Sequence, residues 1–203
     1  YIRYAEKITK ELGDYSDMIC TINEANLTSC FAHSFPGYPA GGMKTLMPFV
    51  SEAAKSCGST LENFGPFLFG HPFKIRDCMM KAHVKSFPVI KENLNNDQPV
   101  GITLSIMDYQ CVEGGESVRD EAHKESVDVC LDQTKNDDFI GIQTYTRHTF
   151  GPDGIITPNF KTSDMLVMGY EYYPESLENV LRYVSPKINL SLIHISEPTR
   201  PST

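Results

Sequence analysis

Apolar residues recur at helical spacing over the first twelve positions of the chain: Tyr1, Tyr4, Ala5, Ile8 and Leu12. This spacing predicts an amphipathic helix with these residues in one stripe, and Gly13 with Asp14 marks its end. The next apolar run, residues 18–22, is short and rich in β-branched side chains, which indicates a core strand. The chain therefore begins with a helix that is followed at once by a strand.

The same alternation continues along the chain. Further helices are predicted at residues 74–93, at 120–132 and from 174 onward, and further strands at 100–106 and 138–145. We expect Pro88 to bend or end the first of these helices. Strands that alternate with helices form parallel sheets with right-handed crossovers, so the pattern predicts an α/β fold.

A long connection rich in Gly and Pro, residues 26–70, separates the first strand from the helix at 74–93. Within it, only residues 47–56 have the pattern of a short helix. Structureless loops of this length are uncommon unless they are functional. We therefore expect this connection to border a substrate pocket.

Two polar residues, Asn23 and Glu24, stand directly at the end of the first strand. In parallel α/β barrels the carboxyl ends of the strands carry the active site, because the βα loops open there. Glu24 is therefore a candidate catalytic residue. Taken alone the pair is weak, since Asn and Glu are also common in ordinary loops.

The charge of the chain restricts its partners. The formal net charge is −8, and no cluster of Lys and Arg is visible, which argues against nucleic acid and anionic membranes. No apolar stretch approaches the roughly 20 residues needed to span a bilayer. These features fit a small neutral or cationic substrate, and they leave the oligomeric state open.

Six cysteines are spread along the chain without a C-x-x-C pair. Zinc sites use closely spaced ligand pairs, so we expect no metal site. Reduced thiols and a cytoplasmic location are the preferred interpretation, with secretion left open because the chain starts at Tyr1 rather than Met. A glycosylation sequon at Asn26 is discounted because it adjoins the candidate site.

Several short motifs together resemble one family of barrel enzymes. They are Leu12-Gly13-Asp14, Thr21-Ile22-Asn23-Glu24, Ala82-His83, Asp138-Phe139-Ile140-Gly141 with Tyr145, and Gly169-Tyr170-Glu171-Tyr172-Tyr173-Pro174-Glu175. In this order they resemble glycoside hydrolase family 1, the β-glucosidases. The resemblance covers residues 1–189 and implies a partial (β/α)8 TIM barrel, roughly strands four to six with their helices, in which the N-terminal and C-terminal parts of the barrel are missing.

The resemblance also implies roles for particular residues. Glu24 would be the proton donor and base, Asn23 would bind the sugar 2-hydroxyl, Gln143 would line the same subsite, and Tyr145 would hydrogen-bond the nucleophile. The family's nucleophile is a Glu in a Thr-Glu-Asn-Gly motif, and this chain has no such motif. No cofactor is implied.

The chain departs from the family pattern at three places. Ile19 stands where Trp is common, Ala25 where Pro is common, and Gln143 where Asn is common. None of these changes removes a reacting group, but the substrate is left undefined. Among the histidines we expect His83 to be structural, whereas His33 and His148, with Tyr38, lie in loops that would border the aglycone.

Three interpretations of function remain open on the sequence. The first is a retaining β-glycosidase, represented here by an incomplete fragment that would itself be inactive. The second is a degenerate sugar-binding homologue without hydrolysis. The third is a hydrolase of another family in the same barrel clan. The strand at 138–141 together with Tyr145 distinguishes the first interpretation from the third.

The last residues of the chain have a different character. Back-translation of residues 190–200 gives a DNA sequence that resembles a transposase adapter used in preparing sequencing libraries. We therefore treat residues 190–203 as a sequencing-adapter artefact and expect them to contribute nothing to the fold. The partial barrel is expected to occupy residues 1–189.

Overall fold

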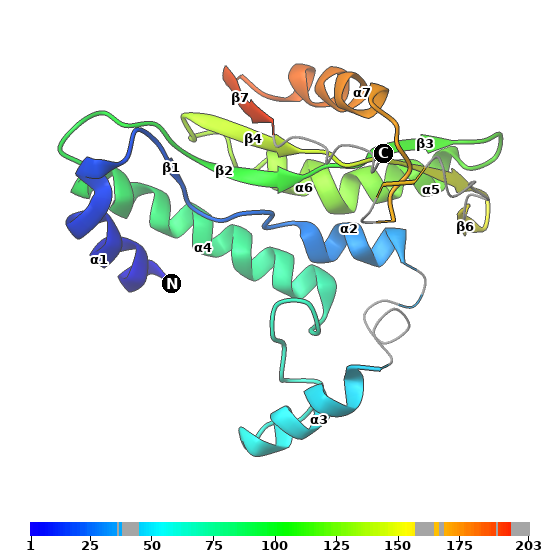
Figure 1. Cartoon of the computed structure of the whole chain (residues 1–203), viewed down its shortest axis with the longest axis horizontal. Coiled ribbons are helices and arrows are strands. Elements are labelled where there is room, and N and C mark those ends of the chain that lie inside the picture. Colours follow the sequence, from blue (N-terminus) through cyan, green and yellow to red (C-terminus); the bar gives the residue numbers. More distant parts are fainter. Residues whose placement is uncertain (36, 38–44, 157–164, 167–168, 190, 196–203) are drawn as a thin grey trace.

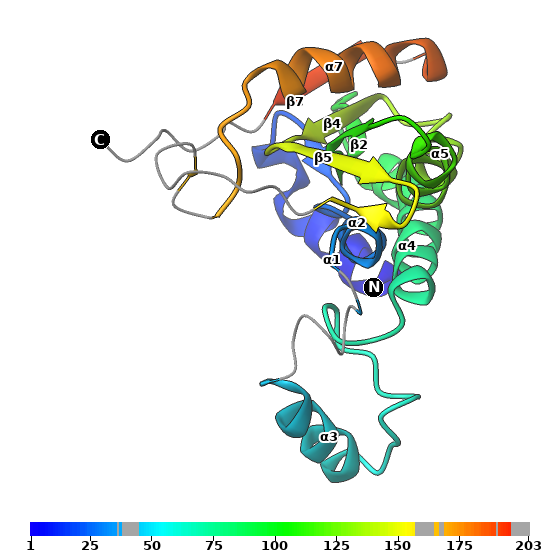
Figure 2. The same cartoon turned by 90° about the vertical axis from the view of Figure 1, so that its right-hand side faces the viewer.

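The computed structural model describes residues 1–35, 37, 45–156, 165–166, 169–189 and 191–195. Its centre is a four-stranded sheet in the order β1-β2-β4-β7. All neighbouring strands in this sheet are parallel, which confirms the predicted parallel α/β arrangement. Figure 2 shows α7, α5 and α4 arranged in an arc around one side of the sheet.

Strands β2 (Val100–Ser105) and β4 (Phe139–Gln143) form the interior of this sheet. Every residue of both strands is buried, as in parallel sheets that are covered on two faces. Strand β1 (Ile19–Cys20) is shorter than predicted, although Thr21 still donates from its backbone nitrogen to the Gly101 carbonyl at 2.8 Å. The chain therefore leaves the sheet just before Asn23 and Glu24.

Helix α4 (Pro72–Asn93) lies along this sheet and continues through Pro88, where we expected a bend or an end. Helix α1 (Ile2–Leu12) packs against α4. Ala5 and Thr9 are the buried residues of α1, whereas Tyr1, Tyr4, Ile8 and Leu12 are exposed. The predicted helix is present, but only part of its apolar stripe is buried, because α4 covers only the side of α1 that carries the short side chains.

The long connection contains more structure than its composition indicated. Helix α2 (Leu27–Ser34) begins shortly after Glu24 and was not predicted, because its eight residues are mostly small or polar. Helix α3 (Met47–Ser56) has the predicted bounds. Figures 1 and 2 both show α3 apart from the sheet.

The second half of the chain adds a helical segment and a small sheet. Helix α5 (Glu116–His123) continues through a π-helical turn, Lys124–Asp128, into α6 (Val129–Leu131), close to the predicted helix. Strands β3 (Asp108–Cys111), β5 (Arg147–Gly151) and β6 (Gly154–Ile155) form a sheet that was not predicted. Strands β3 and β5 pair in parallel just beyond the ends of β2 and β4.

The C-terminal elements close the described part of the chain. Helix α7 (Glu175–Val184) begins after Pro174, as predicted, and buries Val180 and Val184. Strand β7 (Ser191–Ile195) pairs in parallel with β4, so this part of residues 190–203 does join the sheet, contrary to our expectation. Without β7, β4 would be the edge strand of this sheet, and its free backbone groups could pair with any extended segment that follows α7.

Candidate active site

The four site residues predicted from the sequence lie in one hydrogen-bonded cluster at the carboxyl ends of β1, β2 and β4. Gln143 Nε2 donates to Asn23 Oδ1 at 2.5 Å. The Tyr145 hydroxyl lies 3.1 Å from Glu24 Oε1 and 3.1 Å from Gln143 Oε1. Residues that are 120 positions apart in the sequence therefore share one network, here called the Glu24 cluster.

Tyr145 has a partner that we did not expect. The family resemblance gave its hydroxyl to the nucleophile, whereas in this structure it reaches Glu24. Both ends of the Gln143 amide are also used within the protein, by Asn23 and Tyr145. In the described part of the chain no second carboxylate belongs to the Glu24 cluster.

One member of the Glu24 cluster was missed by sequence reasoning. Thr103, on β2, donates from its hydroxyl to Asn23 Oδ1 at 3.0 Å and accepts from the Glu24 backbone nitrogen at 3.3 Å. A Thr inside an apolar strand reads as an ordinary strand former. The available signal was that Thr103 is one of two polar residues, with Ser105, in the apolar run 100–106.

Glu24 sits at a turn that the structure holds firmly. Its φ of 50° lies in the left-handed region, which is uncommon for a residue other than glycine and costs conformational energy. Its side chain is partly buried, while Asn23 is exposed. The left-handed turn directs the chain from the end of β1 into α2.

Asn26 stabilises this turn through the hydrogen bonds of its side-chain amide. It is fully buried, and its Nδ2 donates to the carbonyl oxygens of Ser105 at 2.7 Å and Ser126 at 2.9 Å. Its Oδ1 accepts from the Ser105 backbone nitrogen at 2.8 Å. These contacts tie the residues after Glu24 to the end of β2, and they leave the sequon asparagine inaccessible to a glycan.

A second tyrosine lies beside the Glu24 cluster. The ring of Tyr170 stacks on that of Tyr145, with centroids 5.8 Å apart. Burial raises the pKa of Tyr170, and the nearby negative charge of Glu24 raises it further. Tyr170 is therefore close enough to Glu24 for the carboxylate charge to affect the pKa of its hydroxyl.

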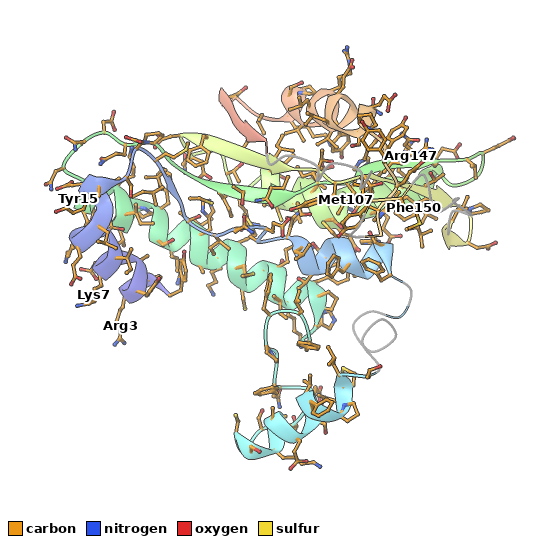
Figure 3. The ribbon with its side chains drawn as sticks, in the orientation of Figure 1. Arg3, Lys7, Tyr15, Met107, Arg147 and Phe150 are labelled. Atoms are coloured by element: carbon orange, nitrogen blue, oxygen red, sulfur yellow. The ribbon has the colours of Figure 1, made fainter. Side chains whose placement is uncertain are left out.

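An ion pair holds the same segment in place. Arg147 binds Glu171 through two nitrogens, each at 2.8 Å, and its guanidinium lies over the Tyr173 ring. Figure 3 shows Arg147 at the same end of the sheet as Met107 and Phe150, whereas Arg3 and Lys7 project from α1 at the opposite end. The planar, two-point contact fixes the orientation of the segment as well as its position.

The histidines fall outside the Glu24 cluster. His83 Nδ1 lies 2.7 Å from the Thr21 hydroxyl and His83 Nε2 lies 3.1 Å from Asp137, in a fully buried arrangement behind the sheet. Burial raises the pKa of Asp137. His33 is in α2, 3.0 Å from Glu125, and His148 is in β5 rather than a loop. Tyr38 lies outside the described residues.

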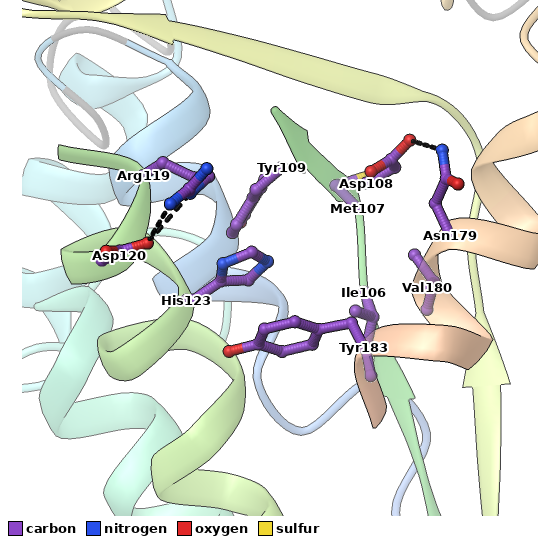
Figure 4. Close-up of a pocket in the computed structure, with 10 residues that line it drawn as sticks. All are labelled: Ile106, Met107, Asp108, Tyr109, Arg119, Asp120, His123, Asn179, Val180 and Tyr183. Atoms are coloured by element: carbon purple, nitrogen blue, oxygen red, sulfur yellow. Dashed lines mark hydrogen bonds and ion pairs between the residues drawn. The ribbon is translucent and has the colours of Figure 1, made fainter. Parts of the chain in front are cut away.

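A cavity of about 320 Å³ lies elsewhere, between α5, β3 and α7 (Figure 4). Four of its polar side chains already have partners: Asn179 donates to Asp108 at 2.8 Å, and Arg119 pairs with Asp120 at 2.7 Å. Burial lowers the pKa of His123 to about 4, so its ring, stacked on Tyr183, is neutral near pH 7. The cavity shares no residue with the Glu24 cluster and offers no comparable chemistry.

The described residues carry neither a metal-ligand cluster nor a membrane-spanning helix. No group of three or more His, Cys, Asp and Glu side chains in these segments is arranged to hold a metal ion. No helix in the same segments is both long and apolar enough to cross a membrane.

The chain resembles β-glucosidases and β-glycosidases of known structure. β-Glycosidase BGL167 is 30% identical, with a TM-score of 0.80 over 94% of this chain and 45% of its own. β-Glucosidase 1317 is 26% identical, with a TM-score of 0.75 over 94% of this chain and 46% of its own. No protein-family model and no curated protein sequence matches the chain.

More distant structures agree in fold. The hyperthermophilic β-glucosidase from Pyrococcus furiosus is 21% identical, with a TM-score of 0.63 over 96% of this chain and 40% of its own. This chain therefore spans less than half the length of the proteins that it matches. The comparisons confirm the resemblance indicated by the sequence motifs: the chain has the fold of one part of a β-glucosidase barrel of the glycoside hydrolase family 1 type.

Proposed function

We propose that this chain is part of a retaining β-glycosidase that acts on small β-glucosides or related β-glycosides. The single observation that carries the proposal is the Glu24 cluster, in which Asn23, Glu24, Gln143 and Tyr145 are joined by hydrogen bonds at one edge of a parallel sheet. That edge is where parallel barrels place catalytic groups. The 30% identity to a β-glycosidase supports the same assignment.

The strand order fits a particular part of the barrel. We propose that β1, β2 and β4 correspond to barrel strands four, five and six. Strand β7, which pairs with β4, then lies where strand seven would lie. This assignment puts Glu24 at the end of strand four.

Glu24 is proposed as the proton donor and base. In a retaining glycosidase one carboxyl group protonates the departing oxygen and then deprotonates water, while a second attacks the anomeric carbon. The reaction needs the two carboxyl groups about 5–5.5 Å apart. Because the described residues supply only Glu24 to the cluster, we propose that the 203-residue chain alone does not hydrolyse glycosides.

Asn23 is proposed to donate to the sugar 2-hydroxyl. Hydrogen bonds to this hydroxyl strengthen as positive charge develops on the sugar ring, and they contribute several kcal/mol to catalysis. Asn23 is exposed at the edge of the sheet, next to Glu24, as this role requires. The substrate is therefore a carbohydrate whose reacting ring lies above both residues.

A hybrid enzyme tests the proposal. Residues 1–189 replace the matching part of β-glycosidase BGL167, which supplies the remaining strands and the second carboxylate. Glu24→Ala in the hybrid should slow hydrolysis of alkyl glucosides by about 10²–10⁴-fold, because a poor leaving group needs protonation. Release of nitrophenol from an aryl glucoside should be slowed far less in its first turnover, because that leaving group hardly needs a proton.

The control is Glu52→Ala, which removes an exposed carboxylate on α3 and should leave both activities unchanged. Equal slowing of both substrate classes by Glu24→Ala would contradict the proposed role. If the Glu24→Ala hybrid bound glucosides normally and the unmodified hybrid showed no hydrolysis, the sugar-binding alternative would be supported instead.

A further inference from the structure

The Thr103 hydroxyl contacts three other members of the Glu24 cluster. The Thr103 side chain is 7% exposed on the middle strand β2, between the ends of β1 and β4. Its Oγ1 lies 3.3 Å from the Glu24 backbone nitrogen, 3.1 Å from Gln143 Nε2 and 3.0 Å from Asn23 Oδ1. One hydroxyl thus contacts both residues proposed to act on the substrate.

The donors and acceptors around Thr103 determine the direction in which its hydroxyl proton points. A backbone N–H can only donate, so Thr103 Oγ1 accepts from Glu24. A hydroxyl has two acceptor positions and one proton. Glu24 and Gln143 are the two close donors to these positions, since the Cys20 thiol is farther away, at 3.9 Å. The Thr103 proton is therefore directed at Asn23 Oδ1.

This order determines what Asn23 offers to a ligand. Its Oδ1 receives the Thr103 proton and also Gln143 Nε2, at 2.5 Å. With its oxygen used in this way, the amide presents its nitrogen to the exposed side of the site. Gln143 has its amide nitrogen bonded to Asn23 and its amide oxygen bonded to Tyr145.

The neighbouring strand is shaped to accept Thr103 at this place. Gly141 lies directly opposite Thr103 in the register of β2 and β4. A Cβ atom at position 141 would lie 2.5 Å from Thr103 Cγ2, closer than real Cβ contacts occur. The glycine therefore leaves the space that the threonine methyl group occupies.

We propose that Thr103 is a positioning residue for this site: its hydroxyl fixes the Asn23 amide as a donor and holds the backbone of Glu24 in place. The proposal rests on the proposed glycosidase function and adds a residue that acts through Asn23. It requires the substrate to carry a hydrogen-bond acceptor at the position that Asn23 faces. Loss of the Thr103 hydroxyl should therefore matter only when that acceptor is present.

The first test uses the BGL167 hybrid with a pair of substrates, an aryl β-glucoside and its 2-deoxy analogue. Thr103→Val removes the hydroxyl and keeps the shape. It should lower kcat/KM for the glucoside by about fivefold, the value of one ordinary hydrogen bond, mainly through kcat. The 2-deoxy analogue should lose less than twofold, and Thr103→Ser should restore the glucoside rate.

Thr134→Val is the matched control, since Thr134 is also buried and its hydroxyl donates to the Leu131 carbonyl at 2.9 Å away from the site. It should change neither rate. Equal losses on the two substrates with Thr103→Val would overturn the proposal, because they would show a general structural defect.

The second test needs no activity and uses the 203-residue chain itself. Hydrogen exchange of the Glu24 backbone amide, followed by NMR, should become about fivefold faster in Thr103→Val and stay near the parent rate in Thr103→Ser. The Asn23 side-chain amide signals should shift in the Val variant only. Unchanged exchange and unchanged signals would overturn the proposal.

The two tests separate this inference from the proposed function. If Thr103→Val alters the Glu24 and Asn23 signals but Glu24→Ala leaves alkyl glucoside hydrolysis intact in the hybrid, the positioning contacts exist and the glycosidase role of Glu24 fails. If Glu24→Ala behaves as expected and Thr103→Val has no effect in either test, only the role of Thr103 fails.

Discussion

Replacing Asn26 by Ala should destabilise the protein more than replacing an average buried polar residue. Asn26 is fully buried, and its amide satisfies three backbone groups: the carbonyl oxygens of Ser105 and Ser126 and the backbone nitrogen of Ser105. Alanine would leave all three without that partner. These contacts hold the turn that carries Glu24, so the same substitution should also loosen the position of Glu24 in the candidate site.

The magnitude follows from the number of groups left unsatisfied. Each buried polar group without a partner costs about 1–3 kcal/mol, and some of that cost is recovered by local rearrangement or by a water molecule. Three such groups at the lower end of this range, with the small void left by the side chain, give a loss of about 4 kcal/mol. Because domains are stable by only about 5–15 kcal/mol, the variant would be close to unfolding.

Urea unfolding followed by circular dichroism measures this loss directly. The matched control is Asn63→Ala, because Asn63 is exposed and its amide contacts only the nearby Thr60 hydroxyl, at 3.2 Å. The control should change the free energy of unfolding by less than about 0.5 kcal/mol. A loss below about 1 kcal/mol for Asn26→Ala would show that the described contacts do not hold the turn.

Two further substitutions test other parts of the structure. Burial lowers the pKa of His148 to about 4, below the 6.5 of an exposed histidine. As the pH falls, the unfolded chain therefore binds this proton before the folded chain does. About 2 kcal/mol of stability should be lost as the pH falls from 7 to 5. His148→Gln, which can still bond to Ser34, should remove that part of the pH dependence in urea unfolding, and an identical pH dependence in both proteins would refute the assignment. Gly141→Ala places a Cβ 2.5 Å from Thr103 Cγ2 and should lower the free energy of unfolding by about 1–3 kcal/mol. In the control Gly65→Ala the nearest neighbour is at 3.5 Å, so the loss should be less than about 1 kcal/mol. Equal losses in the two variants would show that Gly141 has no steric role.

The central strands and most helices could be predicted because their signals are local. Strands β2 and β4 are short apolar runs, and α3 and α7 have helical periodicity with proline near the first turn. The buried face of α1 could not be predicted, because the pattern is compatible with several orientations and only the position of α4 selects one. The pairing of β3 with β5 joins Asp108 to Arg147, which are far apart in the sequence, and no local pattern records it. The short β5–β6 hairpin is local, but it lies in a region that was predicted to be loop from residue 151 onward.

The candidate site was partly predictable for the same physical reason. The carboxyl ends of parallel strands carry the active site in barrels, so Asn23 and Glu24 were expected at that edge. Gln143 and Tyr145 were assigned to the same site by the family resemblance. Their mutual hydrogen bonds required the structure, as did the contact of Tyr145 with Glu24 in place of the nucleophile. Thr103 was missed because its role depends on the register of three strands.

The central claim, that Glu24 is the acid/base of a retaining β-glycosidase, is tested most directly by azide rescue of the Glu24→Ala hybrid. Without the base, water attacks the glycosyl-enzyme slowly, and azide, which needs no deprotonation, should restore turnover of an aryl glucoside. The account predicts a β-glycosyl azide as the product, identified by NMR. No rescue, or an azide of the α configuration, would contradict it.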